Sequence, residues 1–222
     1  MNTSLTRPHI PLKKIHLSRN VIRKLKNVSR LSSINQWEYV GNIKYKNFEF
    51  DTSEYTTSKR RDYIEEKDFM KVCNSPILYH THPGISYPGH NTDENMEIFT
   101  TLPSNRDFHT YITMFPKIQV NIICDSHGYY VIDMISAASN HTIPLPSSVY
   151  DEMTNLRKSP GLLSSVFYED GEYYHTTLKN WKRVINGDLD SYLSYLYGIS
   201  IKYYAYEDDP PVITTCQDIY VA

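Results

Sequence analysis

The sequence predicts a mixed α/β domain in which helices flank a central mixed β-sheet. Two observations lead to this prediction. Short apolar runs have the composition of strands, and between them lie stretches with apolar residues at helical spacing. Their order along the chain is helix, strands, crossover, helix and strands, which is typical of an α/β or α+β sandwich. A chain of 222 residues, 40% hydrophobic and 22% charged, is long enough to form such a core.

The N-terminal half contains recognisable signals for each element. Ser18 is a candidate N-cap, and Ser32, Ser33 and Asn35 should end the helix that it begins. Residues 84–103 contain turn signals and mixed polarity, so we expect a long loop there. The elements expected before that loop are a helix from Ser18 to about residue 31, strands over 37–45 and 47–57, a short helix over 64–73 and a strand over 76–80.

Beyond the loop, Ser104 and Asp107 have the spacing of a capping box and predict the start of a helix after Pro103. The elements expected after it are strands over 118–125 and 128–136, a hairpin over 166–174 that turns at Asp170-Gly171, a helix over 188–197 stopped by Gly198, and a last strand over 199–206. We divide the chain into a basic arm over 1–16, a domain over 17–145 and an extension over 146–222. The extension either completes the same sheet or forms a separate flap.

Composition excludes several classes of protein. No run approaches the roughly 20 apolar residues that span a bilayer, so we expect no membrane span and no signal peptide. Cys73, Cys124 and Cys216 are odd in number and lack CxxC spacing, which fits free thiols in a reducing compartment and argues against a disulfide framework or a cysteine-based zinc site. We expect an intracellular, cytoplasmic protein. Its many Tyr, Asn, Ile and Lys residues suit an AT-rich genome such as that of a large virus, so the host cytoplasm or a virion is a possible location.

The N-terminal segment is basic. The first acidic residue is Glu38, and eight basic residues precede it: Arg7, Lys13, Lys14, Arg19, Arg23, Lys24, Lys26 and Arg30. Such a block can bind an anionic partner, such as nucleic acid, an anionic surface or an acidic protein. More often such a block is simply the solvated face of a helix together with a loose arm. No nucleic-acid-binding motif accompanies it.

The most informative stretch is "SPILYHTHPG", in which a strand-like run leads into His80, His82 and Pro83. Side chains at i and i+2 of an extended segment point to the same side, so both imidazoles can reach one metal ion. Asp107, at the start of the next helix, is a natural third ligand, and Glu38 is an acid in an apolar run. Each residue alone has an ordinary structural interpretation, as a sheet-rim histidine, a cap or the polar face of an edge strand. Their conjunction and order favour a metal site.

This order resembles the JAMM (MPN-plus) zinc metalloprotease family, whose pattern is an upstream Glu followed by H-x-H-P and S-x-x-D. The matching pieces are Glu38 with Gly41 in "EYVG", "HTHP" at 80–83 and "SNRD" at 104–107. The string "SNRDFHTY" is similar to the corresponding helix start of AMSH-type deubiquitinases. The resemblance covers roughly residues 17–135.

The resemblance implies an MPN-like, cytidine-deaminase-like sandwich with an extra C-terminal hairpin and helix. It implies His80, His82 and Asp107 as ligands of one Zn²⁺ ion, Glu38 as the acid/base that activates water, and Ser104 as a hydrogen-bond donor to the oxyanion. Substrates would be conjugates of ubiquitin or a ubiquitin-like protein, cleaved at peptide or isopeptide bonds. The alternative is a catalytically silent MPN-like scaffold that binds partners in a complex or viral particle.

The gap of 20 residues between Pro83 and Ser104 departs from the family, in which it is much shorter. The insertion can shape a substrate groove or cover the site. His90 and Asp93 within it are competing ligand candidates, and His109 is a candidate neighbour of the metal site. Rival catalytic motifs, among them H-E-x-x-H and G-x-S-x-G, are absent from the sequence, and nothing close to Cys73 would activate its thiol.

Overall fold

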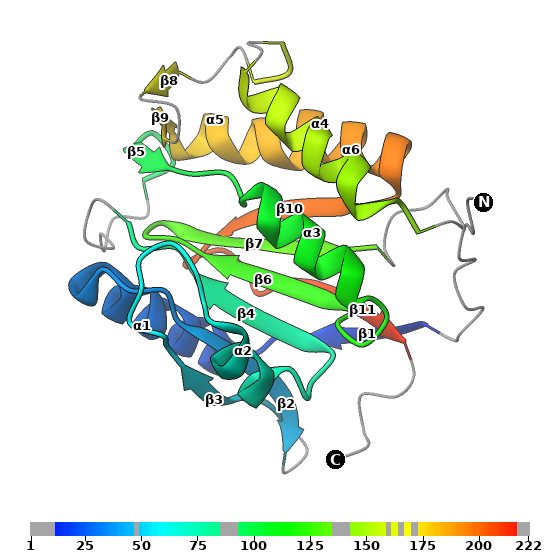
Figure 1. Ribbon diagram of the computed structural model, residues 1–222. Coiled ribbons are helices and arrows are strands. Elements are labelled where there is room, and N and C mark those ends of the chain that lie inside the picture. Colours follow the sequence, from blue (N-terminus) through cyan, green and yellow to red (C-terminus); the bar gives the residue numbers. More distant parts are fainter. Residues whose placement is uncertain are drawn as a thin grey trace, which may run out of the picture.

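The protein is a mixed α/β structure built around one six-stranded mixed sheet (Figure 1). The computed structural model describes residues 12–46, 49–84, 93–134, 143–158, 161–163, 167–169 and 173–216. The order of strands in the main sheet is β10-β7-β6-β4-β2-β3. Two smaller sheets accompany it, a β1-β11 pair and a three-stranded β5-β9-β8 sheet. The expected class, helices around a central mixed sheet, is therefore confirmed.

The elements have the following bounds. The strands are β1 Leu12–His16, β2 Val40–Lys46, β3 Glu49–Thr56, β4 Ile77–Thr81, β5 Glu97–Thr100, β6 Val120–Cys124, β7 Gly128–Asp133, β8 Phe167–Glu169, β9 Tyr173–Thr177, β10 Ser200–Ala205 and β11 Val212–Cys216. The helices are α1 Arg19–Asn35, α2 Glu66–Val72, α3 Asn105–Met114, α4 Pro146–Lys158, α5 Leu178–Arg183, the π-helical turn η1 Val184–Leu189, and α6 Asp190–Tyr197.

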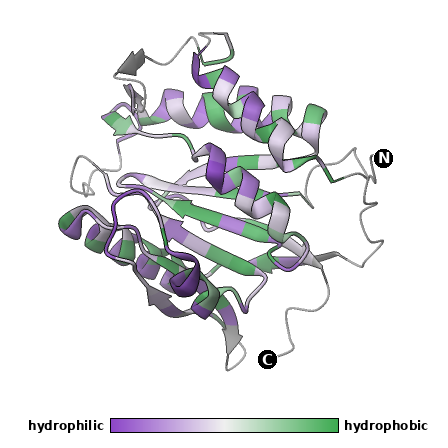
Figure 2. Cartoon of the chain, viewed as in Figure 1, coloured by the Kyte–Doolittle hydropathy of each residue, from purple (hydrophilic) through white to green (hydrophobic). Residues whose placement is uncertain are grey.

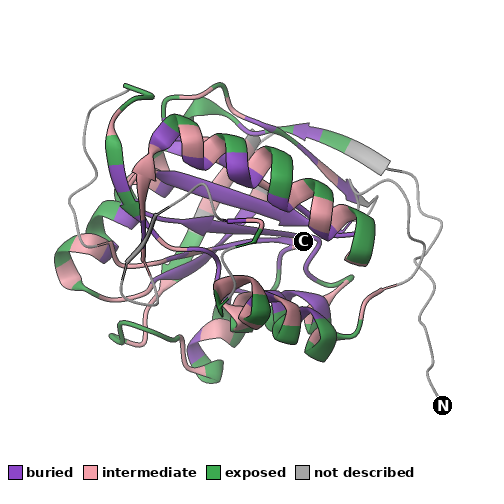
Figure 3. Ribbon diagram, turned by 90° about the horizontal axis from the view of Figure 1, so that it is seen from above, coloured by how far each residue is buried: buried purple, intermediate pink, exposed green. Residues whose placement is uncertain are grey.

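The main sheet is buried on both faces (Figure 3). Residues of α3, α4, α5, η1 and α6 form the core on one face, and α1 with the β1-β11 pair forms the core on the other. Side chains alternate along β4 between the two cores. Leu78 packs in the core with α3, whereas Ile77 and Tyr79 pack in the core with α1. Figure 2 shows the matching pattern, with long hydrophobic stretches in the central strands and hydrophobic bands alternating with hydrophilic ones on the helices.

The connection between the parallel strands β4 and β6 determines where α3 begins. β4 and β6 pair in parallel, with His80 opposite Ile123, while the other described pairs in the main sheet are antiparallel. The chain between β4 and β6 contains α3, which must run back across the sheet. The N-terminus of α3 therefore lies at the edge where β4 ends.

Two predicted boundaries in the N-terminal half were wrong. Helix α1 continues to Asn35, because the buried hydroxyl of Ser32 donates a hydrogen bond to the carbonyl of Trp37 and the helix ends only where Gln36 adopts a left-handed φ of 55°. β2 begins at Val40, so Glu38 lies just before the strand in which it was expected. The loop after β3 holds Glu38 there, since its N–H donates to the carbonyl of Arg60 and its carbonyl accepts from the Thr57 hydroxyl.

The segments flanking the predicted core also form strands. Residues 12–16, within the segment expected to be an arm, pair as β1 with β11, which lies after the strand predicted to be the last. Residues 97–100, expected to belong to a loop, form β5 and pair with β9. β10 adds to the edge of the main sheet beside β7. The two strands of the predicted hairpin, β8 and β9, pair antiparallel. The predicted turn of this hairpin at Asp170-Gly171 lies outside the described residues.

Gly41 offers a test of this packing. A Cβ atom there would lie 2.4 Å from the ring of Tyr79 and 2.6 Å from the carbonyl oxygen of Glu54, so neighbours in the sheet would have to move. We predict that Gly41→Ala lowers the free energy of unfolding by about 1–3 kcal/mol. Gly187→Ala is the control, because a Cβ atom at Gly187 meets nothing within 4 Å. Denaturant titration measures both, and equal stability of the two variants would contradict the packing described.

Candidate metal centre

His80 and His82 lie at the carboxyl end of β4, on the face that carries α3. Leu78 and His80 share a face because side chains alternate along a strand. The parallel pairing continues past the strand, since the N–H of His82 donates to the carbonyl of Cys124 over 2.8 Å. This bond keeps the chain extended and places both imidazoles on the side of α3. The predicted i, i+2 arrangement is therefore present.

Asp107 enters the same space from the first turn of α3. Its N–H donates to the hydroxyl oxygen of Ser104 at 3.1 Å, and its Oδ2 accepts from the N–H of Ser104 at 2.6 Å. These two bonds form the predicted capping box. They fix the position of Ser104 and the orientation of the Asp107 carboxylate, so the sequence signal for a helix start also indicates how this carboxylate is held.

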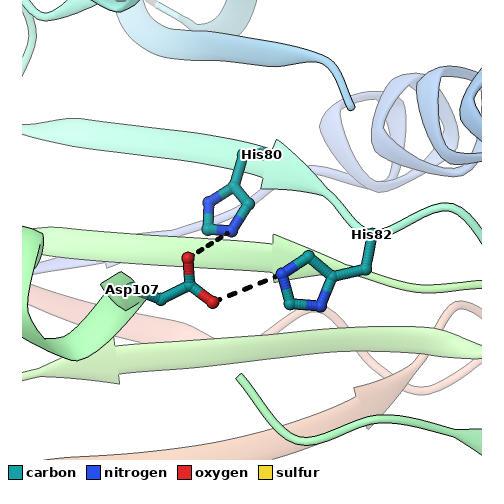
Figure 4. Close-up of side chains that lie close together, drawn as sticks. All are labelled: His80, His82 and Asp107. Atoms are coloured by element: carbon teal, nitrogen blue, oxygen red, sulfur yellow. Dashed lines mark ion pairs between the residues drawn. The ribbon is translucent and has the colours of Figure 1, made fainter. Parts of the chain in front are cut away.

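The three side chains point toward one another (Figure 4). Nε2 of His80 lies 3.1 Å from Oδ1 of Asp107, and Nε2 of His82 lies 3.3 Å from Oδ2. One ligand atom from each residue lies within 4.8 Å of the other two, so the group can hold a metal ion. Nε2 of His80 is buried, and its 3.1 Å contact with Oδ1 of Asp107 lacks the angle of a hydrogen bond. A buried nitrogen in this state is suited to coordinate a cation.

In the metal-free site, His82 and Asp107 each shift the pKa of the other toward its charged form. Burial would raise the pKa of Asp107, but the charges of His80 and His82 outweigh it and hold that pKa well below the usual range. Burial would lower the pKa of His82, but its interactions with Asp107 and Glu38 raise it overall. Metal ligands must be deprotonated, so a divalent cation bound here would displace any proton from the two imidazoles and keep the Asp107 carboxylate ionised.

Glu38 faces the same site. Val40 pairs with His80, and Thr81 donates its N–H to the carbonyl of Tyr39, so continuing this register places Glu38 opposite His82. Side chains of opposite residues lie on one face of the sheet. Burial raises the pKa of Glu38 to about 7, against the opposing effect of His82 and His80. The carboxyl can therefore both accept and donate a proton near neutral pH.

A cavity of about 1150 Å³ opens onto these residues. Glu38, His80, His82, Ser104 and Asp107 all lie in its wall, so the structure brings together the five residues that match the JAMM pattern. From the histidines the cavity extends between α2 and α3. Its apolar part is lined by Phe69, Met70, Leu78, Tyr111, Met114 and Ile118. The cavity thus has space for part of a larger molecule beside His80, His82 and Asp107.

Two residues of the site were not found from the sequence. Thr101 places its hydroxyl oxygen 3.4 Å from Nδ1 of His82, on the opposite side of the ring from Asp107. A partner at Nδ1 orients the ring and leaves Nε2 for a metal. Arg157 of α4 lies in the cavity wall, and its Nη2 donates to the carbonyl of Pro103. Neither residue belongs to a local motif. The long gap before Ser104, which contains Thr101, was the only sequence signal, and it did not point to Arg157.

The other candidates lie elsewhere or outside the described residues. Asp93 is exposed and belongs to no ligand group that the described residues form, whereas His90 lies outside them. His109 is exposed on α3 and does not line the cavity.

The basic N-terminal segment is partly neutralised within the chain. Arg19 bonds the carboxylate of Asp209 at 2.9 Å, and Lys26 bonds that of Glu207 at 2.6 Å. Lys24 pairs with Asp51. Acidic residues near the C-terminal end therefore neutralise part of the positive charge of the N-terminal segment. An external anionic partner for this segment stays a prediction.

Comparison with known proteins adds no identity, because the chain matches no model of a protein family and no curated protein sequence. Within the described ranges, no helix combines the length and apolarity needed to cross a membrane.

The raised pKa of Glu38 predicts a pH-dependent cost in stability. The unfolded chain releases this proton near pH 4.5 and the folded, metal-free protein only near 7, so the free energy of unfolding falls as the pH rises between these values. We predict that Glu38→Gln is more stable than the wild type by about 3 kcal/mol at pH 8, with the difference vanishing below pH 4.5. Denaturant titration in a chelator measures this. A variant less stable than wild type at pH 8 would refute it.

Proposed function

We propose that the protein is a zinc-dependent isopeptidase or peptidase that removes ubiquitin or a ubiquitin-like modifier from proteins. The observation that carries the proposal is the convergence of His80, His82 and Asp107 in one cavity wall with Glu38 and Ser104. Their order along the chain is that of the JAMM (MPN-plus) pattern, and the mixed sheet with flanking helices is compatible with an MPN-like fold.

The donor set fits zinc. Two imidazole nitrogens and one carboxylate oxygen are the ligands of many catalytic zinc sites, in which a fourth position stays open for water. The buried Nε2 of His80, which faces the Asp107 carboxylate at 3.1 Å without the angle of a hydrogen bond, supports a cation at this place. Zinc bound there would supply Lewis-acid activation of water and of the carbonyl to be cleaved.

Glu38 is placed to move the proton. As a carboxylate it accepts a proton from the water that adds to the carbonyl carbon. It then donates this proton to the nitrogen of the lysine side chain or peptide that leaves as the C–N bond breaks. A pKa of about 7 in the metal-free site suits both steps.

Ser104 is placed to bind the oxygen on which negative charge develops. Its hydroxyl oxygen already accepts the N–H of Asp107, so the hydroxyl hydrogen remains to be donated into the cavity. A donor that meets charge developing in the transition state contributes a few kcal/mol. The apolar part of the cavity would exclude water and receive substrate side chains.

Zinc binding is the first test. We predict about one zinc ion per wild-type chain and loss of tight binding in His82→Ala and Asp107→Asn. The Asn side chain keeps an oxygen that accepts the N–H of Ser104, so the helix cap survives while the charged ligand is lost. The controls are His109→Ala and Asp93→Asn, both exposed positions. Elemental analysis of dialysed protein measures the content, and full zinc in either site variant would disprove the ligand assignment.

Activity is the second test. We predict that Glu38→Gln binds zinc like the wild type but cleaves ubiquitin or ubiquitin-like isopeptide conjugates about 10²–10⁴-fold more slowly, because the proton acceptor is lost. Glu66→Gln, at another carboxyl in the cavity wall, is the control. Undiminished cleavage by Glu38→Gln would remove Glu38 from the mechanism. A zinc-loaded wild type inactive on the whole panel would favour the scaffold alternative.

A further inference from the structure

The segment from Thr101 to Asp107 carries much of the site. Thr101 contacts His82, Ser104 lies in the cavity wall and Asp107 completes the ligand group. The segment connects β5 to α3, and its geometry therefore sets the position of one ligand and the orientation of another. Whatever holds it in place controls the precision of the site.

Helix α4 holds this segment on both sides of Ser104. Nη2 of Arg157 donates to the carbonyl oxygen of Pro103 at 2.5 Å and lies 3.3 Å from that of Leu102. Nδ2 of Asn105 donates to the hydroxyl of Thr154 at 2.6 Å, one turn earlier on the same helix. Earlier in the segment, the carbonyl of Thr101 accepts from the Tyr130 hydroxyl at 2.7 Å. The residues next to Ser104 in sequence are thus both bonded to α4.

The guanidinium of Arg157 contacts the backbone of the segment before α3. In the part of the chain that the structure describes, its guanidinium bonds carbonyl oxygens and makes no ion pair with a carboxylate. Its Nε is buried and has no hydrogen-bond partner among those residues, and the side chain lines the cavity that contains His80 and Asp107. Arg157 is only half-buried and has no carboxylate partner among these residues, so its charge by itself adds little to stability. The clear effect of this side chain is to fix two carbonyl groups beside the site.

We propose that Arg157 is a positioning residue for the metal centre, which holds Leu102 and Pro103 so that Ser104 and Asp107 keep the geometry that binds zinc and acts on substrate. The inference rests on the proposed function and extends it to residues 146–158, which lie outside the stretch that resembles the JAMM family. A metal site loses affinity when the groups that orient its ligands are removed, typically 10–100-fold.

The test compares Arg157→Met with the wild type. Methionine keeps much of the apolar stem and removes the donors, so the fold should persist. We expect the dissociation constant for zinc alone, measured by competition with a chromophoric chelator, to rise about 10-fold or more, with the unfolding temperature of the metal-free protein nearly unchanged. Arg157→Lys should recover part of the affinity, because one ammonium group can still bond a carbonyl. On a cleaved conjugate, kcat should fall while KM stays the same.

Two controls separate positioning from general stability. Lys158→Met changes an exposed neighbour on α4 and should leave the zinc affinity unchanged. Met153→Ala opens a cavity at a fully buried position on α4, so it should lower the unfolding temperature without the same loss of zinc affinity. An Arg157→Met protein with wild-type zinc affinity would overturn the inference alone. A wild type that binds no zinc would instead overturn the proposed function, and with it the metal centre that Arg157 is proposed to position.

Discussion

The parallel pairing of β4 with β6 is the constraint on which the site depends. Two parallel neighbours require a crossover, and the helix in it begins at the edge where the first strand ends. The carboxyl end of β4 supplies two imidazoles, and the first turn of α3 supplies a carboxylate. Polar groups that would be costly inside the sheet thus meet at its rim, where a metal ion can satisfy them. This is the general position of ligand sites in sheets with parallel strands.

Much of the site could be predicted because its signals are local. The apolar run before His80 indicates a strand, the spacing to His82 places both rings on one side, and Ser104 with Asp107 indicates a helix start. Each of these depends on residues within one turn or a few positions of each other. The capping box is the most informative, because the same two hydrogen bonds that begin α3 also orient the proposed ligand.

The rest depends on contacts between distant segments. β5 has only four residues and is a strand because β9, more than 70 residues later, pairs with it. β1 pairs with β11 across almost the whole chain. Glu38 lies outside β2, held by the loop after β3, and Arg157 reaches the site from α4. Periodicity and spacing carry no information on such partners. The two residues missed at the site, Thr101 and Arg157, act through these long-range contacts.

The central claim is that one zinc ion binds His80, His82 and Asp107. A crystal of untagged protein grown with stoichiometric zinc, with diffraction data collected on both sides of the zinc absorption edge, tests it most directly. The account predicts one strong anomalous peak per chain about 2 Å from an imidazole nitrogen of each histidine and from a carboxylate oxygen of Asp107. An absent peak, or a peak on other side chains with these three residues unchanged, would contradict it.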